Sequence, residues 1–204
     1  MKRIAVLASG NGSNLQALIE QLHVPDSPVE IGLVVVNVAS AHALNRGKAA
    51  GIPSFFLPHE AQGSRQDYEA ALVQLLQKHE TDFVCLAGFM RLLGCHFLNA
   101  FPNRVLNVHP SLLPSFPGKH APEKALKAGV KLTGCTVHLV DEGMDTGPIL
   151  AQVAVPVLHN DDVSSLTSRI QHAEHLLYPR VVRLFAEGRV LHKNAHFFLE
   201  GWPP

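Results

Sequence analysis

The sequence is poor in the features that mark several large classes of protein. Its 204 residues contain three cysteines, Cys85, Cys95 and Cys135, and no Cys-x-x-Cys pair. An odd number of widely spaced cysteines argues against a disulfide framework and against a zinc knuckle. Reduced, partly buried thiols of this kind are typical of cytosolic proteins, so we expect a cytoplasmic location.

Net charge and long apolar runs are also absent. Seventeen Lys and Arg balance seventeen Asp and Glu, which leaves no basic field to hold a phosphate backbone. The apolar run at residues 31–36 ends at Asn37, far short of the roughly 18 residues of a membrane span. The start MKRIAVLAS is too short for the core of a signal peptide and suits a first strand. We therefore expect neither a nucleic-acid nor a membrane partner.

What the sequence does contain is an alternation of Val-, Ile- and Leu-rich runs with amphipathic stretches, in a chain that is 47% hydrophobic. This pattern predicts strands at residues 3–8, 29–36, 53–57 and 82–87, and helices at residues 14–22, 41–50 and 66–79. The last of these strands is apolar on both faces, as in parallel sheets covered by helices. The order predicts an α/β fold: a Rossmann-like, open, mostly parallel twisted sheet with helices on both faces.

The pattern changes after Ala100. It predicts a strand at residues 104–108, a helix at 121–128, strands at 132–140 and 149–157, and a long helix at 162–187. Two strands joined by a short polar turn predict an antiparallel C-terminal extension. Asp162 is a candidate N-cap of the long helix and Gly188 its candidate C′ residue, while Pro179 is expected to kink or split it. We expect residues 1–204 to form a single domain.

A glycine-rich motif, SGNGSN at residues 9–14, lies between the first strand and the first helix. Ligands bind at this end of a parallel sheet, and a helix N-terminus there favours an anion. A dinucleotide fingerprint needs a small residue where this chain has Leu15, and an acid where the second strand ends in Asn37. The motif favours a cradle for a single phosphate, with a structural turn and a dinucleotide site as alternatives.

A second motif is NVHPSLLP, at residues 107–114. Asn107 and His109 share one face of a strand, so both can serve one small site. The amide can donate to an oxygen that becomes negative, and the imidazole can carry a proton. The alternative is a polar strand end followed by a stiff turn.

A third motif is the acidic turn DEGMDTGP at residues 141–148. Its carboxylates could bind a metal or form an ordinary turn, and one of them could keep a histidine charged. On the late helix, Glu174 stands between His172 and His175, but the spacing is not that of a zinc-binding His-Glu-x-x-His. Glu174 could equally be a surface charge.

These motifs carry a resemblance to a known family. SGNGSNLQA, LAGFMRLL, LNVHPSLLP, PGKHA and the Asp145-x-Gly-Pro turn occur in this order along almost the whole chain, which resembles the phosphoribosylglycinamide formyltransferases, folate-dependent enzymes of purine synthesis. Formyl-tetrahydrofolate enzymes in general share Asn-x-His-x-Ser-Leu-Leu-Pro. SGNGSNLQ is more specific to this transferase and to the related formyltetrahydrofolate hydrolase.

The resemblance implies roles for the matching residues. The catalytic residues would be Asn107, His109 and Asp145. The 5′-phosphate of glycinamide ribonucleotide would bind to Gly12, Ser13 and Asn14, and the rest of that substrate to Gln171 and Glu174. The folate would bind to Arg65, Met90, Arg91, Leu92, Leu93, Asn107, Asp141 and Asp145. Residues 1–100 would then be the phosphate-binding half, and residues 101–204 the catalytic and folate-binding half. Lys119 lies in a variable stretch and receives no role.

The implied reaction is transfer of the formyl group of 10-formyltetrahydrofolate, a co-substrate, to the amine of glycinamide ribonucleotide. Asp145 would keep His109 protonated and oriented, and no metal is required. Alternatives are the hydrolase, which releases formate, methionyl-tRNA formyltransferase, and a non-enzymatic nucleotide-sensing module. The chain has neither the length nor the basic charge of the tRNA enzyme. We expect a monomer or a weak homodimer.

Overall fold

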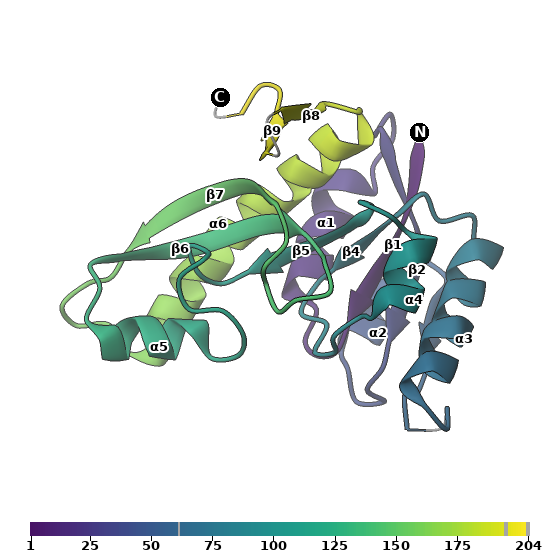
Figure 1. Ribbon diagram of the computed structural model, residues 1–204, viewed down its shortest axis with the longest axis horizontal. Helices are drawn as coiled ribbons and strands as arrows, with labels where there is room; N and C mark the ends of the chain where they lie inside the picture. The colour runs from purple at the N-terminus through teal and green to yellow at the C-terminus, as the bar shows by residue number, and fades with distance from the viewer. Residues whose placement is uncertain (61, 194–195, 203–204) are drawn as a thin grey trace. The chain divides into compact units, whose positions relative to one another are not determined.

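The computed structural model describes residues 1–60, 62–193 and 196–202 (Figure 1). The chain divides into two compact units, Met1–Leu106 and Asn107–Pro204. The first unit contains β1 (Lys2–Ala8), α1 (Ser13–Leu22), β2 (Val29–Val36), α2 (Ala43–Ala49), β3 (Ser54–Phe56), α3 (Arg65–Lys78), β4 (Phe83–Leu86), α4 (Cys95–Ala100) and the start of β5 (Val105–His109). The second unit contains the end of β5, α5 (Ala121–Ala128), β6 (Leu132–Leu139), β7 (Ile149–Pro156), α6 (Val163–Ala186), β8 (Val190–Lys193) and β9 (His196–Leu199).

The strands of the first unit are parallel and lie in the order β3-β2-β1-β4. Ile4 to Ala8 of β1 are fully buried, and the four residues of β4 are at most 5% exposed. Strands covered on both faces read as continuous apolar runs, and the sequence shows such runs at these positions. The four strands therefore confirm the expected parallel sheet.

The helices of the first unit form two groups. α1 packs with α2, and α3 packs with α4, side by side in Figure 1. The chain moves outward from β1 to β3 and then returns to β4, and right-handed crossovers put the outward and returning helices on opposite faces of the sheet. The direction of the chain thus reverses between β1 and β4, which is where open α/β sheets bind ligands.

The second unit contains the antiparallel extension. β6 and β7 pair antiparallel, with Cys135 opposite Val153, and α6 packs along both strands in Figure 1. The side chain of Asp162 accepts from the amide of Ser165 and caps α6, as expected. α6 continues through Pro179 without a break, so of the two expected effects of this proline, a kink or a split, the split is wrong. Gly188 follows the helix with φ 73°, the left-handed conformation of a C′ glycine.

Two elements of the structure, α4 and the β8–β9 hairpin, were not predicted from the sequence. α4 has six residues and β8 and β9 four each, too few for a periodic pattern to stand out. Among the described residues, none of the helices is long and apolar enough to cross a membrane.

Candidate active site

The loop after β1 is shaped for close approach of a ligand. Gly12 is the N-cap residue of α1 and has φ 75°. A Cβ at this position would lie 2.7 Å from the Cβ of Ala43, so only glycine fits. The amide of Ala43 donates to the Gly10 carbonyl at 3.1 Å, which fixes the loop against α2. The first amides of α1 are not used within the helix, so residues 12–14 keep the geometry expected of an anion cradle.

Arg46, on α2, holds this loop from the side, and the sequence analysis missed it. Its Nε donates to the Asn11 carbonyl at 2.8 Å and its Nη2 to Asn11 Oδ1 at 3.2 Å. Its Nη1 donates to Gln16 Oε1 at 3.1 Å. The contacts span up to 35 positions in sequence, so no local motif announces them.

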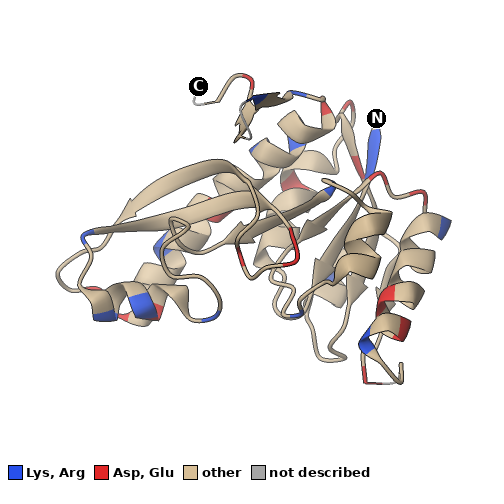
Figure 2. Cartoon of the chain, in the orientation of Figure 1, with Lys and Arg blue, Asp and Glu red and all other residues tan. Residues whose placement is uncertain are grey.

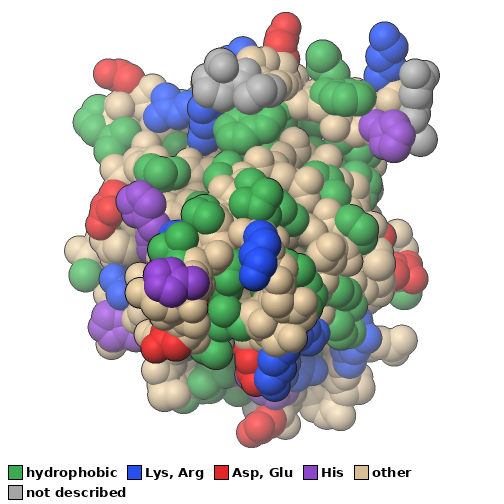
Figure 3. Space-filling view, turned by 90° about the vertical axis from the view of Figure 1, so that its left-hand side faces the viewer, with side chains coloured by type: hydrophobic (Ala, Val, Ile, Leu, Met, Phe, Trp, Pro, Cys, Tyr) green, Lys and Arg blue, Asp and Glu red, His purple; other side chains and the backbone are tan. Residues whose placement is uncertain are grey.

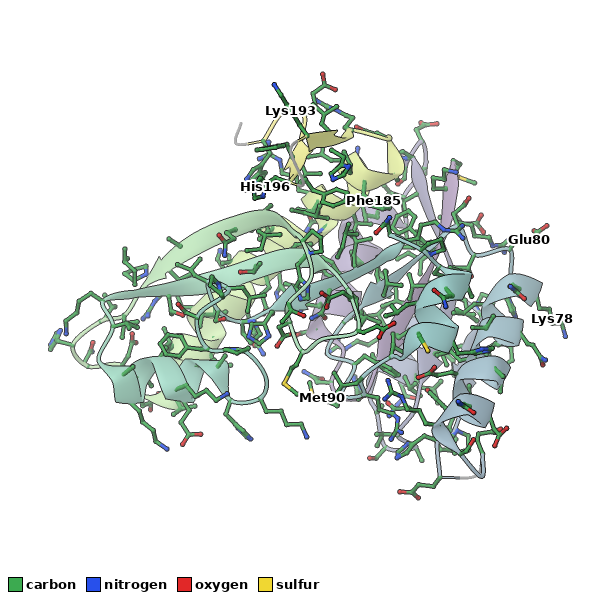
Figure 4. The ribbon with its side chains drawn as sticks, in the orientation of Figure 1. Lys78, Glu80, Met90, Phe185, Lys193 and His196 are labelled. Atoms are coloured by element: carbon green, nitrogen blue, oxygen red, sulfur yellow. The ribbon has the colours of Figure 1, made fainter. Side chains whose placement is uncertain are left out.

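Ser9 connects the loop after β1 to the loop after β4. Its amide donates to the Gly88 carbonyl at 3.1 Å, and its hydroxyl accepts from the Met90 amide at 2.8 Å. The same hydroxyl donates to Asn37 Oδ1 at 2.6 Å. The expected folate segment, residues 90–93, is therefore fixed to the expected phosphate loop within the first unit. Met90, labelled in Figure 4, is 61% exposed and Leu92 is 52% exposed, whereas Leu93 is buried.

In the second unit, Asn107 and His109 lie on β5, and His109 is only 5% exposed. Nδ1 of His109 lies 3.3 Å from Asp145 Oδ2, and its Nε2 lies 3.0 Å from the Phe116 carbonyl. Both ring nitrogens thus face acceptors, so either N–H of the ring has a partner. Asp145 adopts φ 57° and also accepts from the Gly118 amide at 2.7 Å. The structure thus brings His109 and Asp145 together, as predicted.

His138, on β6, completes this group and was also missed by the sequence analysis. Its Nε2 lies 3.1 Å from Asn107 Nδ2 and its Nδ1 2.9 Å from the Leu139 carbonyl. Burial is the main cause that lowers the pKa of His138, opposed by the Leu139 carbonyl and by the charge of Asp145. A neutral ring that donates from Nδ1 and accepts at Nε2 satisfies both contacts. A single histidine within the strand-like run at residues 132–140 was the only signal in the sequence.

The acidic loop uses one of its carboxylates internally. Oδ1 of Asp141 accepts from the Gly143 amide at 3.1 Å and from the Thr146 hydroxyl at 2.8 Å. This pattern stabilises a turn. Within the part of the chain that the structure describes, there is no group of three His, Cys, Asp or Glu residues that could hold a metal ion.

The remaining expected site residues lie on two helices. Arg65 begins α3, with its side chain 51% exposed and its Nε 2.8 Å from Glu69. On α6, Gln171 is exposed whereas Glu174 is 5% exposed, so the reading of Glu174 as a surface charge is wrong. Burial, together with the charge of Glu174, raises the pKa of the Cys135 thiol to about 12. Cys85 and Cys135 are buried, but Cys95 is exposed.

Charged residues are dispersed over the chain. Figure 2 shows Lys and Arg interspersed with Asp and Glu along the elements of each unit. On the face drawn in Figure 3, hydrophobic, basic, acidic and histidine side chains are likewise mixed.

The fold and this group of residues define a class: α/β proteins in which a paired histidine and carboxylate lie near an asparagine amide. The comparison with known families is more specific. The family model that describes formyl transferases matches residues 2–182, and the chain belongs to this family.

Relatives of known name agree with this assignment. Phosphoribosylglycinamide formyltransferase of Bacillus subtilis is 42% identical over 183 residues, which are 90% of this chain and 94% of that protein. The crystal structure of glycinamide ribonucleotide transformylase 1 from Symbiobacterium toebii has a TM-score of 0.95 and 47% identity, over 98% of this chain and 94% of that one. The human trifunctional purine biosynthetic protein adenosine-3 is 45% identical over 92% of this chain, which spans only 19% of that protein. In the corresponding Drosophila pseudoobscura protein the share is 14%.

Proposed function

We propose that this protein transfers the formyl group of 10-formyltetrahydrofolate to the amine of glycinamide ribonucleotide. The products are N-formylglycinamide ribonucleotide and tetrahydrofolate, a step of de novo purine (IMP) biosynthesis. The observation that carries the proposal is the pairing of His109 with Asp145 at 3.3 Å, with Asn107 on the same strand. The two bacterial relatives, which match almost the whole chain, support the choice of substrates.

The reaction needs an attack and a proton transfer. The free amine attacks the formyl carbon on N10, and the carbonyl oxygen becomes negative. Asn107 Nδ2 and a His109 N–H donate to that oxygen, and each positioned donor typically lowers the barrier by about 3–4 kcal/mol. Since Nε2 of His109 faces the Phe116 carbonyl, it has to leave that carbonyl in order to donate to substrate, while Nδ1 stays with Asp145.

Collapse of the tetrahedral species breaks the bond between the formyl carbon and N10. The proton leaves the amine and reaches N10, carried by His109 or by a water beside Asp145. Neither a covalent enzyme intermediate nor a metal takes part in this scheme. The neutral ring of His138, which carries its proton on Nδ1, accepts from Asn107 Nδ2 at its Nε2 and so holds the Asn107 amide in place.

The binding roles follow the same assignment. Gly12, Ser13 and Asn14 bind the 5′-phosphate, and Gln171 and Glu174 hold the rest of glycinamide ribonucleotide. The folate is bound by Arg65, by Met90, Arg91, Leu92 and Leu93, and by Asn107, Asp141 and Asp145. The exposed apolar side chains of Met90 and Leu92 suit a planar heterocycle. A single domain, a monomer or weak homodimer, a cytoplasmic location and the absence of nucleic-acid and membrane partners remain predictions.

A formyl-transfer assay with and without glycinamide ribonucleotide tests the proposal. We expect tetrahydrofolate to form only when the ribonucleotide is present, in equal amount to the formylated product. Release of formate without the ribonucleotide would indicate the hydrolase instead. Binding of the ribonucleotide without turnover would indicate a sensing module.

A further inference from the structure

One face of α3 carries three residues that together hold another segment of the first unit. Arg65, Tyr68 and Glu69 stand at positions i, i+3 and i+4, so their side chains project from the same face of the helix. The segment they contact is residues 90–94, between β4 and α4. Glu69 and Tyr68 have no role in the mechanism above.

Glu69 is a buried carboxylate with two partners on one oxygen. It is 3% exposed, and its Oε1 accepts from Arg65 Nε at 2.8 Å and from the Gly94 amide at 2.8 Å. A charge is costly to bury unless it is paired and hydrogen-bonded. A Cβ at Gly94 would lie 2.9 Å from Arg65 Nη2 and 3.1 Å from Glu69 Oε1, so the backbone approaches this pair closely because residue 94 is glycine.

The segment at residues 90–94 is fixed at both ends and in the middle. The Met90 amide donates to Ser9 Oγ at 2.8 Å, and the Gly94 amide donates to Glu69. Between them, the Arg91 guanidinium lies 5.6 Å from the centre of the Tyr68 ring, a cation–π contact. The apolar side chains of Met90 and Leu92 are thereby presented to solvent on a held backbone.

We infer that Glu69 is a positioning residue for the formyl donor, acting through Arg65 and through the Gly94 end of this segment. The inference rests on the proposed function, which gives the donor to Arg65 and to residues 90–93. One carboxylate oxygen fixes both the arginine suited to the carboxylates of the folate glutamate and the backbone suited to the pterin. Binding groups held in place before the ligand arrives lose less conformational freedom on binding. Because Glu69 itself is buried, its effect reaches the donor only through these two partners.

The test is Glu69→Gln, which keeps the size of the side chain and removes its charge. We expect KM for 10-formyltetrahydrofolate to rise about tenfold, the usual effect of losing a hydrogen bond to a charged group. The kcat and KM for glycinamide ribonucleotide should stay unchanged, a split that general loss of stability does not produce. The matched control is Glu123→Gln on α5, which breaks an exposed i, i+4 pair to Lys127 of 2.7 Å and should alter none of these constants.

A donor without the glutamate, 10-formyltetrahydropteroate, separates the two partners. If Glu69 also acts through Gly94, Glu69→Gln raises KM for this donor too, although by less. A rise confined to the full donor would overturn the role of Gly94, and an unchanged KM for both donors would overturn the inference.

Two measurements keep the inference testable if Glu69→Gln folds poorly or if the wild type shows no transfer. Gly94→Ala pushes a methyl group against Arg65 and Glu69, and we expect it to weaken donor binding in the same way. Calorimetric Kd values for tetrahydrofolate need no turnover. Wild type that binds tetrahydrofolate but transfers no formyl group would contradict the proposed function, whereas unchanged Kd values in both variants would contradict the role of Glu69.

Discussion

The two compact units offer their candidate functional groups in different ways. The first unit presents apolar side chains that are open to solvent: Met90 is 61% exposed and Leu92 is 52% exposed. The second unit buries the two histidines of its candidate site, with His109 5% exposed and His138 2% exposed. Groups that capture a ligand must be reachable, whereas groups that stabilise developing charge act more strongly away from water. We therefore expect substitutions in the first unit to change mainly KM, and substitutions at the buried histidine pair of the second unit to change mainly kcat.

The largest effect should come from the buried side chains. Asp145→Asn removes the charge 3.3 Å from His109 Nδ1. It places beside that nitrogen an amide that can turn either its oxygen or its NH2 group toward the ring. We expect kcat to fall by roughly 10³- to 10⁴-fold, as when the carboxylate of a catalytic His–Asp pair becomes an amide. KM for both substrates should change much less. Steady-state kinetics check this.

Asp161→Asn is the matched control for that variant. Asp161 belongs to the same unit, its side chain is 2% exposed, and it pairs with Arg169 at 2.7 Å. Hydrogen bonds from Arg169, chiefly, hold the pKa of Asp161 well below its ordinary value. Its loss should lower the stability of the fold and leave kcat alone. A near-normal turnover number in Asp145→Asn would contradict the expectation that the buried groups of the second unit control kcat.

The second effect in size belongs to the first unit. In Gly12→Val a side chain has to occupy a left-handed conformation and displace Ala43, 2.7 Å from the new Cβ. We expect KM for glycinamide ribonucleotide to rise on the order of 10- to 100-fold, from 1–3 kcal/mol of local strain in the loop. The kcat at saturation should change little. Titration of the ribonucleotide by calorimetry gives an independent Kd.

Gly51→Ala separates backbone strain from damage to the loop. Gly51 also has a positive φ, 72°, but a Cβ there meets nothing within 4 Å. This variant should lose stability without altering KM for the ribonucleotide. If both variants raise KM equally, the loop at residues 9–14 is not the phosphate site.

Sequence patterns captured the elements and motifs that are local in the chain. The strand at residues 29–36 and the helix at residues 121–128 were predicted to the residue, because the periodicity of apolar residues depends only on positions close together in the sequence. Asn107, His109 and Asp145 were assigned as catalytic residues through the resemblance of their motifs to the formyltransferase family, and that role stays a prediction.

The parts that sequence analysis missed depend on contacts between residues that are distant in the sequence. Arg46 reaches Asn11 across 35 positions and His138 reaches Asn107 across 31. In the sequence alone, an arginine on a short helix and a histidine in an apolar strand are compatible with many roles. Burial decided the case of Glu174, since its pattern on α6 fits a surface charge as well as a site residue. Site contacts of this kind appear only after folding has brought the strands together.

Arg46→Gln tests whether the first unit depends on one side chain to hold its loop. Losing the three donors to Asn11 and Gln16 should raise KM for glycinamide ribonucleotide roughly three- to tenfold, from a net loss of about 1 kcal/mol. Lys48→Gln removes a cation from the exposed side of the same helix and should have no effect. Equal effects of the two variants would mean that net charge matters, and that loop geometry does not.

The smallest effect concerns the cost of burying a titratable ring in the second unit. Burial lowers the pKa of His138 in the folded protein below its value of about 6.5 in an unfolded chain. Below about pH 6.5 the unfolded chain binds a proton at His138 that the folded protein does not bind. The stability linked to His138 is therefore present above about pH 6.5 and is lost as pH falls. We expect this residue to account for a loss of about 1 kcal/mol in the free energy of unfolding between pH 7.5 and 5.5.

Urea unfolding of wild type and His138→Gln at both pH values measures this loss, because the other twelve histidines contribute alike to both proteins. The variant should be less stable at pH 7.5, where its hydrogen bonds to Asn107 and Leu139 are altered, but should lose less on acidification. Parallel losses in the two proteins would show that His138 carries its proton in the folded state, and that its nitrogen does not accept from Asn107.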